Sequence, residues 1–307
     1  MDLTSPKIIK EFLSKYETRP SKGLGQNFLI DENILKKIIK SADIKPNDII
    51  LEVGPGIGNL TRELAKKVHP HTKRDDMVGE NTNKSGSRSG VGAGKVISVE
   101  KDKKMIEILK ETLKDYKNIE VINADILKLN PQHYTLNPYK VVANIPYYLT
   151  SPLIRKFLEE KNPPQEMVLM LQKEVAQRIC SKPPDMNLLA VSVQFYAEPK
   201  IISYVSKNCF WPAPKIDSAI IKIIPKIKKQ IKNDLFFKVV KAGFSQPRKQ
   251  LVNNLSKTLK LTKEQTIALL IKNNIKPNQR AETLSIEDWI KLTNSFLSTK
   301  FINKIIF

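Results

Sequence analysis

Cysteine and histidine are scarce in this chain of 307 residues. It has two cysteines, Cys180 and Cys209, and three histidines. Two thiols cannot form a disulfide framework, so we expect a protein from a reducing compartment. His69 and His71 lie close together in the sequence, but no further ligand stands near them. We therefore expect no metal site.

Long hydrophobic runs are also absent from the sequence. A membrane-spanning helix needs about 18 or more consecutive apolar residues, and no such run occurs. Residues 1–20 lack the apolar segment of a signal peptide, and their acidic side chains argue against a transit peptide. Apolar residues nevertheless make up 41% of the chain, which suffices for a core. We expect a cytoplasmic monomer with one large and one small domain.

Acidic residues are too few to balance the basic ones. The chain has 52 Lys and Arg against 31 Asp and Glu, a formal net charge of +21. One interpretation is a lysine-rich surface that reflects a biased genome. The other is a polyanionic partner, most simply a nucleic acid, whose binding weakens as salt rises.

A strand, a glycine turn and a helix follow one another at residues 49–67. The apolar run 49–53 leads into Gly54-Pro55-Gly56-Ile57-Gly58, and a helix is predicted from about residue 59 to 67. This order is typical of the first nucleotide-binding unit of a doubly wound sheet. The glycine spacing is not that of a dinucleotide site. Glu52 would repel a pyrophosphate but suits an ammonium group, which favours S-adenosylmethionine (SAM) over NAD.

The second predicted strand, 96–99, ends in Glu100, which is in position to bind ribose hydroxyls. An acidic residue in this role follows the glycine turn by about 20 residues, and here the interval is about twice as long. Residues 69–95 account for the excess. They are polar and glycine-rich without periodicity, so we expect a disordered insertion.

The third and fourth predicted strands also deliver polar side chains. Strand 120–122 leads to Asp125, which is either an acceptor for an adenine amino group or a helix N-cap. Strand 140–143 leads to Asn144-Ile145-Pro146-Tyr147. Ligands bind at the carboxyl ends of strands in open α/β sheets, although Asn-x-Pro also forms ordinary turns.

The rest of the chain divides near Ile227. Before it, we expect strands at 167–171 and 218–224, helices at 5–15, 32–41, 103–115, 150–160 and 173–181, and a turn at Pro199 between 189–196 and 200–205. Beyond it, the pattern is purely helical, at 235–244, 249–260, 263–273 and 286–298. Phe210 and Trp211 cannot both enter a core easily, so one is expected to be exposed for base stacking, with core packing as the alternative.

Five motifs in this order resemble the bacterial KsgA-type small-subunit rRNA adenine dimethyltransferases. They are Gly25-Gln26-Asn27-Phe28-Leu29, residues 51–56, residues 144–147, residues 210–219 and Phe244-Ser245. The resemblance runs from about Pro20 to Trp289 except for residues 69–95. It implies a Rossmann-like SAM-dependent methyltransferase domain with a seven-stranded sheet at 1–226. It also implies a small helical RNA-binding domain at 227–307.

The resemblance further implies that the protein dimethylates N6 of two adjacent adenosines near the 3′ end of 16S rRNA in the 30S subunit. SAM is the donor, S-adenosylhomocysteine the product, and no metal takes part. The implied SAM contacts are Asn27, Leu29, Gly54, Gly56, Glu100, Asp125 and Asn144. The implied catalytic segment is Asn144, Ile145, Pro146 and Tyr147, with base stacking by Tyr147 and Phe210 and RNA contacts at Arg248 and Lys249.

The chemistry of methyl transfer to adenine explains why these residue types are needed. An adenine amino nitrogen is a weak nucleophile, because its lone pair is delocalised into the ring. The Asn144 side-chain oxygen and the Ile145 carbonyl can accept its N–H hydrogens and stabilise the developing positive charge. Pro146 fixes the backbone, and Tyr147 offers a stacking face. The base has to leave its stack to reach them.

Three features depart from the family pattern, and two other functions remain open. The insertion is not part of the pattern, Pro247 replaces a basic residue, and Trp211 is an unusual neighbour for Phe210. The alternatives are a 23S rRNA adenine methyltransferase of the macrolide-resistance type and a non-catalytic assembly or transcription factor on the same fold. The helical C-terminal part favours the small-subunit function.

Overall fold

The computed structural model describes residues 1–68, 94–135, 138–226 and 233–297. The backbone contacts divide the chain into two compact units. The first comprises 1–173 and 200–225, and the second comprises 174–199 and 226–307. Residues 174–199 thus group with the second unit, although the predicted large domain included them. The predicted boundary near Ile227 and most of the predicted insertion, including His69 and His71, lie outside the described residues.

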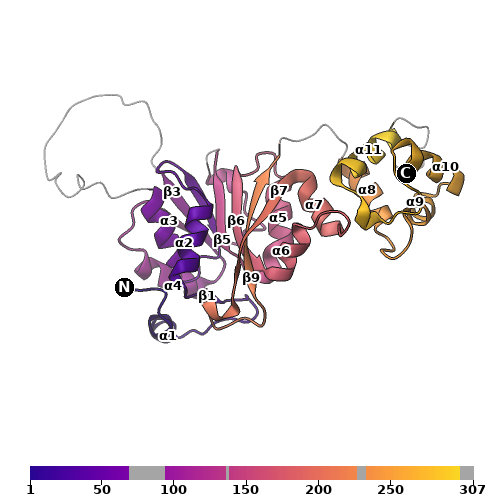
Figure 1. The fold of residues 1–307 in the computed structure, drawn as a ribbon. Helices are drawn as coiled ribbons and strands as arrows, with labels where there is room; N and C mark the ends of the chain where they lie inside the picture. Colours follow the sequence, from indigo (N-terminus) through magenta and orange to yellow (C-terminus); the bar gives the residue numbers. More distant parts are fainter. Residues whose placement is uncertain (69–93, 136–137, 227–232, 298–307) are drawn as a thin grey trace, which may run out of the picture. The chain divides into compact units, whose positions relative to one another are not determined.

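The first unit is built on a seven-stranded sheet in the order β4-β3-β2-β5-β6-β9-β7 (Figure 1). The strands are β2 (Ile49–Val53), β3 (Lys95–Glu100), β4 (Ile119–Asn123), β5 (Lys140–Asn144), β6 (Glu166–Gln172), β7 (Ala197–Val205) and β9 (Ser218–Pro225). From β4 to β6 neighbouring strands run parallel, whereas β9 is antiparallel to β6. This is the predicted doubly wound α/β sheet.

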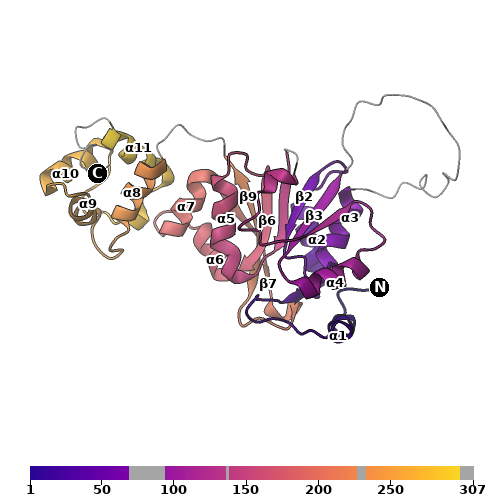
Figure 2. The same ribbon diagram turned by 180° about the vertical axis from the view of Figure 1, so that it is seen from behind.

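Helices cover both faces of the sheet. Helices α2 (Glu32–Ser41) and α3 (Asn59–Val68) bury an apolar stripe against one face, in a cluster that contains Ile50, Val96 and Val142. Helix α4 (Lys103–Thr112) connects β3 to β4, and α5 (Thr150–Glu159) connects β5 to β6. Because β2 to β3 and β5 to β6 step in opposite directions along the sheet, right-handed crossovers place α5 on the face opposite α3 (Figures 1 and 2).

The predicted start of α2 is confirmed in atomic detail. The Asp31 carboxylate accepts hydrogen bonds from the backbone N–H groups of Asn33 and Ile34, which is the N-cap geometry. Asp102 does the same for α4 through the N–H of Lys104. These caps fix the points at which the chain leaves the loops around the sheet's carboxyl edge.

A second, two-stranded sheet was not predicted. Strand β1 (Phe28–Leu29) pairs antiparallel with β8 (Phe210–Trp211), which lies far away in the sequence. Helix α1 (Pro6–Lys15) precedes β1, and its Ile9, Phe12 and Leu13 pack with Phe28 and with residues of α4. The pairing therefore brings the N-terminal segment and the Phe210 loop to one side of the large sheet.

The second unit is helical. Its helices are α6 (Lys173–Ile179), which starts at the last residue of the first unit, α7 (Leu188–Tyr196), α8 (Asn233–Gly243), α9 (Leu251–Leu259), α10 (Lys263–Lys272) and α11 (Ile286–Leu297). Trp289, Phe236 and Phe296 are the largest fully buried side chains of its core, which also contains Ala190 and Val191 of α7. No helix among the residues that the structure describes is long and apolar enough to cross a membrane.

Two local predictions are wrong. Pro199 does not form a turn but lies inside β7, which is an edge strand of the sheet and so tolerates a residue without an N–H. The predicted insertion also extends too far. Lys95 begins β3, and Gly94 is buried where an added Cβ would come within 2.0 Å of the Pro46 carbonyl oxygen and 2.4 Å of the Val68 carbonyl oxygen.

Candidate functional site

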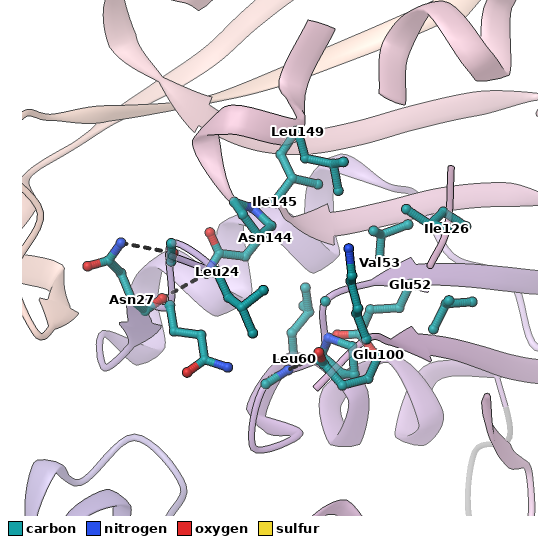
Figure 3. A pocket seen from close by; sticks show the side chains of 18 of the residues that line it. Leu24, Asn27, Glu52, Val53, Leu60, Glu100, Ile126, Asn144, Ile145 and Leu149 are labelled. Atoms are coloured by element: carbon teal, nitrogen blue, oxygen red, sulfur yellow. Dashed lines mark hydrogen bonds between the residues drawn. The ribbon is translucent and has the colours of Figure 1, made fainter. Parts of the chain in front are cut away.

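A pocket lies at the carboxyl ends of β2, β3 and β5 (Figure 3). From β2 the chain continues to β3 on one side, whereas β5 is the neighbour on the other, so the pocket lies at the topological switch point of the sheet. The pocket is lined by every residue that the sequence assigned to the cofactor and the target base: Asn27, Leu29, Gly54, Gly56, Glu100, Asp125, Asn144, Ile145, Pro146, Tyr147 and Phe210. Which ligands they hold stays a prediction.

The glycine turn between β2 and α3 forms the floor of the pocket. Gly54 and Gly56 have φ angles of +68° and +60°, which side-chain-bearing residues rarely adopt. A Cβ at Gly54 would lie 3.6 Å from the Pro146 ring, and one at Gly56 would lie 3.2 Å from the Phe28 ring. The turn therefore leaves its backbone open to a ligand and lets the Asn144 and Phe28 segments approach closely.

Two buried carboxylates face this turn. Glu52 is 1% exposed, accepts a hydrogen bond of 2.7 Å from the Ser98 hydroxyl, and has its pKa raised to about 7 by burial. Burial also raises the pKa of Glu100, whose oxygens accept hydrogen bonds from the backbone N–H groups of Asp102 (2.8 Å) and Gly56 (3.4 Å). Two acids with little solvent access make the pocket suitable for a cationic ligand.

Asp125 is not a helix N-cap. Its carboxylate forms an ion pair with Lys101 at 3.0 Å and accepts the N–H of Leu127 in a turn. The hydrogen bond from Lys101 is the main reason why the pKa of Asp125 is lowered. Asp125 thus remains an ionised acceptor at the pocket wall, which is compatible with its predicted contact to an adenine amino group.

Asn144 connects the end of β5 to the N-terminal segment. Its Nδ2 donates to the Asn27 carbonyl oxygen at 3.4 Å, while Asn27 itself donates to the Gly25 carbonyl oxygen at 3.2 Å (Figure 3). An amide that donates through Nδ2 to the N-terminal segment keeps Oδ1 available as an acceptor within the pocket lining. Asn144 and the glycine turn thus line the same pocket, and the catalytic role of Asn144 stays a prediction.

Tyr147 and Phe210 form the aromatic part of the lining. Tyr147 lies in a short 3-10 turn (Tyr147–Leu149), and its hydroxyl is 2.8 Å from the hydroxyl of Ser218. The prediction that Phe210 or Trp211 is exposed is wrong. Phe210 is 3% exposed and Trp211 is half-buried, because β8 pairs with β1. Trp211 stacks on Phe28 at 6.5 Å between ring centroids, and of the two aromatic residues Phe210 lines the pocket whereas Trp211 does not.

The sequence prediction missed several lining residues. Lys101, Asn59 and Tyr148 each stand next to a predicted site segment, after Glu100, the glycine turn and Tyr147 respectively. Tyr148 is 56% exposed, although it lines the pocket. Adjacency in sequence was the available signal, because loops at a strand end contribute consecutive residues to one site.

Arg248 and Lys249 do not line this pocket. They belong to the second unit, in the exposed segment between α8 and α9. The predicted helix from Lys249 in fact begins at Leu251, so neither cation lies within the first turn. Lys249 and Lys257 line a separate shallow pocket there, together with Ser245, Gln246, Asn253, Asn254 and Thr258.

Metal ligands do not gather anywhere in the part of the chain that the structure describes. There, no group of three or more His, Cys, Asp or Glu side chains could hold a metal ion. The prediction that the protein uses no metal stays a prediction.

Comparison with known proteins gives a consistent result. Residues 17–77 and 78–297 match the family described as "Ribosomal RNA adenine dimethylase". The chain is 44% identical over 288 residues to the ribosomal RNA small subunit methyltransferase A of Dehalococcoides mccartyi strain CBDB1, covering 92% of this chain and 90% of that protein. It is 41% identical over 312 residues to the protein of that name from Clostridioides difficile strain 630, covering 98% and 99%.

Solved structures show the same fold. A dimethyladenosine transferase from Plasmodium falciparum matches with a TM-score of 0.69 and 27% identity, over 88% of this chain and 98% of that chain. The 23S rRNA methyltransferase ErmE matches with a TM-score of 0.66 and 25% identity, over 88% and 99%.

Proposed function

The chain belongs to the ribosomal RNA adenine dimethylase family, and from that premise we propose how its pocket carries out the reaction. The protein is a SAM-dependent rRNA adenine N6-dimethyltransferase that acts on 16S rRNA. We infer that its targets are two adjacent adenosines near the 3′ end, presented in the 30S subunit, in the cytoplasm. We also infer that the enzyme acts as a monomer.

The pocket residues fit SAM. The glycine turn leaves room that a Cβ would fill at Gly54 and Gly56. Glu100, held by two backbone N–H groups, has the position of a ribose acceptor, and Asp125 that of an adenine acceptor. Asn27 and Leu29 close the pocket from the N-terminal side. Buried Glu52 supplies negative charge for a cationic ligand. SAM contributes a methyl group on a positively charged sulfur that leaves readily.

The target adenine is held by the Asn144–Tyr147 segment in this proposal. The Asn144 Oδ1 and the Ile145 carbonyl accept hydrogen bonds from the amino group, which stabilises the charge that develops on nitrogen during transfer. Pro146 packs against Gly25 and Gly54, at 3.4 and 3.6 Å from where their Cβ atoms would be, and so fixes the acceptors. Tyr147 and Phe210 provide flat faces for the base.

RNA contacts extend to the second unit in this proposal. Arg248 and Lys249 are exposed, and basic side chains of this kind bind backbone phosphates without reading sequence. The 23S rRNA alternative gains no specific support. The two relatives reported above, both named for the small subunit, are 44% and 41% identical to the chain, whereas the 23S methyltransferase that matches in structure is 25% identical.

The single observation that carries the proposal is the meeting of the glycine turn, Glu100 and Asn144–Tyr147 in one pocket. The direct test incubates 30S subunits that lack the methylations with the protein and SAM, followed by mass mapping of methylated adenosines. We expect N6,N6-dimethyladenosine at two adjacent positions near the 3′ end of 16S rRNA. Modification of naked 23S rRNA alone would contradict the proposal.

A further inference from the structure

Ser218 is a fully buried polar residue that the reaction as described above leaves without a role. It is the first residue of β9, has 0% exposure, and its backbone pairs with Gln172 at the end of β6. Its hydroxyl shares the 2.8 Å hydrogen bond with the phenol of Tyr147. Ser218 therefore lies at the same edge of the sheet as Asn144, two strands further along, and its hydroxyl reaches a wall of the pocket.

The bond fixes the free end of the Tyr147 ring. The backbone of Tyr147 follows Pro146 in a single 3-10 turn, whose ordered hydrogen bonds end at Leu149 and Thr150. The side chain is half-buried, and the backbone turn alone does not determine its rotamer about the Cα–Cβ bond. A hydrogen bond at the phenol oxygen, the atom farthest from the backbone, fixes the direction in which the side chain points and so the position of the ring.

The neighbouring Asp217 holds the other aromatic wall. Its carboxylate accepts the N–H of Lys207 at 3.1 Å, which closes the loop from 207 to 217 that carries Phe210. Its carbonyl oxygen accepts the N–H of Lys173 at 3.0 Å, which fastens the same residue to the end of β6. Asp217 and Ser218 thus hold the Phe210 loop and the Tyr147 ring in place at the end of β6 and the start of β9.

We propose that Ser218 is a positioning residue for methyl transfer: its hydrogen bond to Tyr147 fixes the position of this ring, and so the shape of the base site that Tyr147 and Phe210 line. The inference rests on the proposed function, because it takes these two rings as the walls of the base site. Ser218 itself touches neither the base nor SAM. Its effect is on the chemical step and on the RNA, whereas SAM binding is independent of it.

Three variants test this role: Ser218→Ala, Tyr147→Phe, and the two combined. Each single change removes the same hydrogen bond, and Tyr147→Phe leaves Ser218 and the aromatic ring in place. We expect each to lower the single-turnover rate on saturating 30S subunits on the order of 10-fold. The double variant should be no slower than the slower single one, since both remove one interaction. The dissociation constant of SAM should change less than about 2-fold.

Thr293→Val is the matched control. Thr293 is also fully buried, and its hydroxyl donates to the Trp289 carbonyl oxygen at 2.8 Å in the second unit. The Thr293→Val variant loses a buried, hydrogen-bonded hydroxyl, as Ser218→Ala does. Thermal unfolding of all variants shows whether each of them folds. We expect its methyl transfer rate to match that of the unmodified protein.

Several results would overturn the inference. They are unchanged rates for Ser218→Ala, additive losses in the double variant, or a loss of SAM affinity as large as the loss of rate. An unmodified protein that does not methylate 16S adenosines at all would instead contradict the proposed function, so the two failures are distinguishable.

Discussion

The amide of Asn144 does two things at once at the scale of the residue. Its Nδ2 donates to Asn27 at 3.4 Å, and its oxygen is left for the substrate. Because one group of the side chain supports the fold and the other is proposed to act on the substrate, few other residues can replace Asn144. An aspartate has no donor for the Asn27 carbonyl, and an alanine has neither group.

Asn144→Ala should reduce methyl transfer about 100- to 1,000-fold, the usual cost of removing one preorganised group from a charge-stabilising site. SAM affinity should fall only a few-fold, because most of the predicted SAM contacts lie on other segments. Single-turnover rates and calorimetric SAM titrations measure the two quantities.

Asn118→Ala is the control for that experiment. Asn118 is a partly buried amide that donates to the Ala65 carbonyl oxygen at 2.8 Å, before β4 rather than after a strand. Its substitution should leave the rate unchanged. Equal losses of rate and of SAM affinity in Asn144→Ala would contradict the acceptor role.

Glu52 predicts a pH dependence of stability. Burial raises its pKa from 4.5 to about 7, so the folded protein holds this proton more tightly than the unfolded chain does. The stabilising contribution is therefore fully present below pH 4.5 and is lost as the pH rises through about 7. Glu52→Gln removes the titration. Urea unfolding between about pH 5 and 8 should show the unmodified protein losing up to about 1.4 kcal/mol per pH unit more than the variant.

SAM affinity gives the second readout of the same titration. An ionised Glu52 attracts a cationic ligand, so affinity in the unmodified protein should rise with pH relative to Glu52→Gln. Parallel pH profiles for the two proteins, in unfolding and in SAM binding, would show that Glu52 keeps an ordinary pKa.

At the scale of the element, the sequence predicted those features that local order determines. Six strands were placed to within one residue at each end. The four central parallel strands β2, β3, β5 and β6 are mostly buried apolar runs, and Asp31 marked the start of α2. The Gly54–Gly58 turn could be predicted because a strand, glycines and a helix follow directly. This local order also fixed the cofactor side of the pocket.

The pairing of β1 with β8 could not be predicted. Two-residue strands carry no periodicity, and the partners Phe28 and Trp211 are far apart in the sequence. For the same reason the burial of Phe210 was missed. The local sequence predicted a turn at Pro199, but Pro199 lies in β7, an edge strand, where a residue without an N–H is tolerated. Which strand lies at the edge depends on the whole sheet and cannot be inferred from the local sequence.

The connection between α3 and β3 supports a deletion experiment. A Cβ on Gly94 would lie 2.4 Å from the Val68 carbonyl oxygen, so the last described residue before 69–93 and the first after it are neighbours. A short glycine-serine linker can join them, because the entropy of closing a short loop is small. Replacing 69–93 in this way should leave methylation of 30S subunits within about 10-fold of the unmodified protein.

Gly94→Ala is the comparison for the deletion. Its Cβ would strike the Pro46 carbonyl at 2.0 Å, so this single change should destabilise the protein by about 1–3 kcal/mol. Chemical denaturation measures it. Two results would contradict these expectations: a linker variant that fails to fold, and a Gly94→Ala variant with unchanged stability.

At the scale of the whole molecule, charge governs the encounter with RNA. A net charge of +21 draws the protein to a polyanion, and each phosphate contact releases counterions. Arg248→Ala combined with Lys249→Ala should make the slope of log affinity against log salt concentration shallower by about 1–2 units. Filter binding to 30S subunits at several salt concentrations measures the slope.

Lys263→Ala combined with Lys272→Ala removes the same charge from the exposed ends of α10 and serves as the matched control. Its salt slope should remain that of the unmodified protein. If both pairs change the slope equally, then overall charge, and not the segment before α9, accounts for the binding.

The strand order also determines when the large sheet can be completed during synthesis. Strand β9 lies between β6 and β7, although it leaves the ribosome after both. Until residues 218–225 have emerged, the nascent chain carries the apolar edge of β6, Met167 to Leu171, without its neighbour. An unpaired apolar edge of this kind invites pairing with other chains. Premature termination before β9 therefore yields a product prone to aggregation rather than a smaller working enzyme.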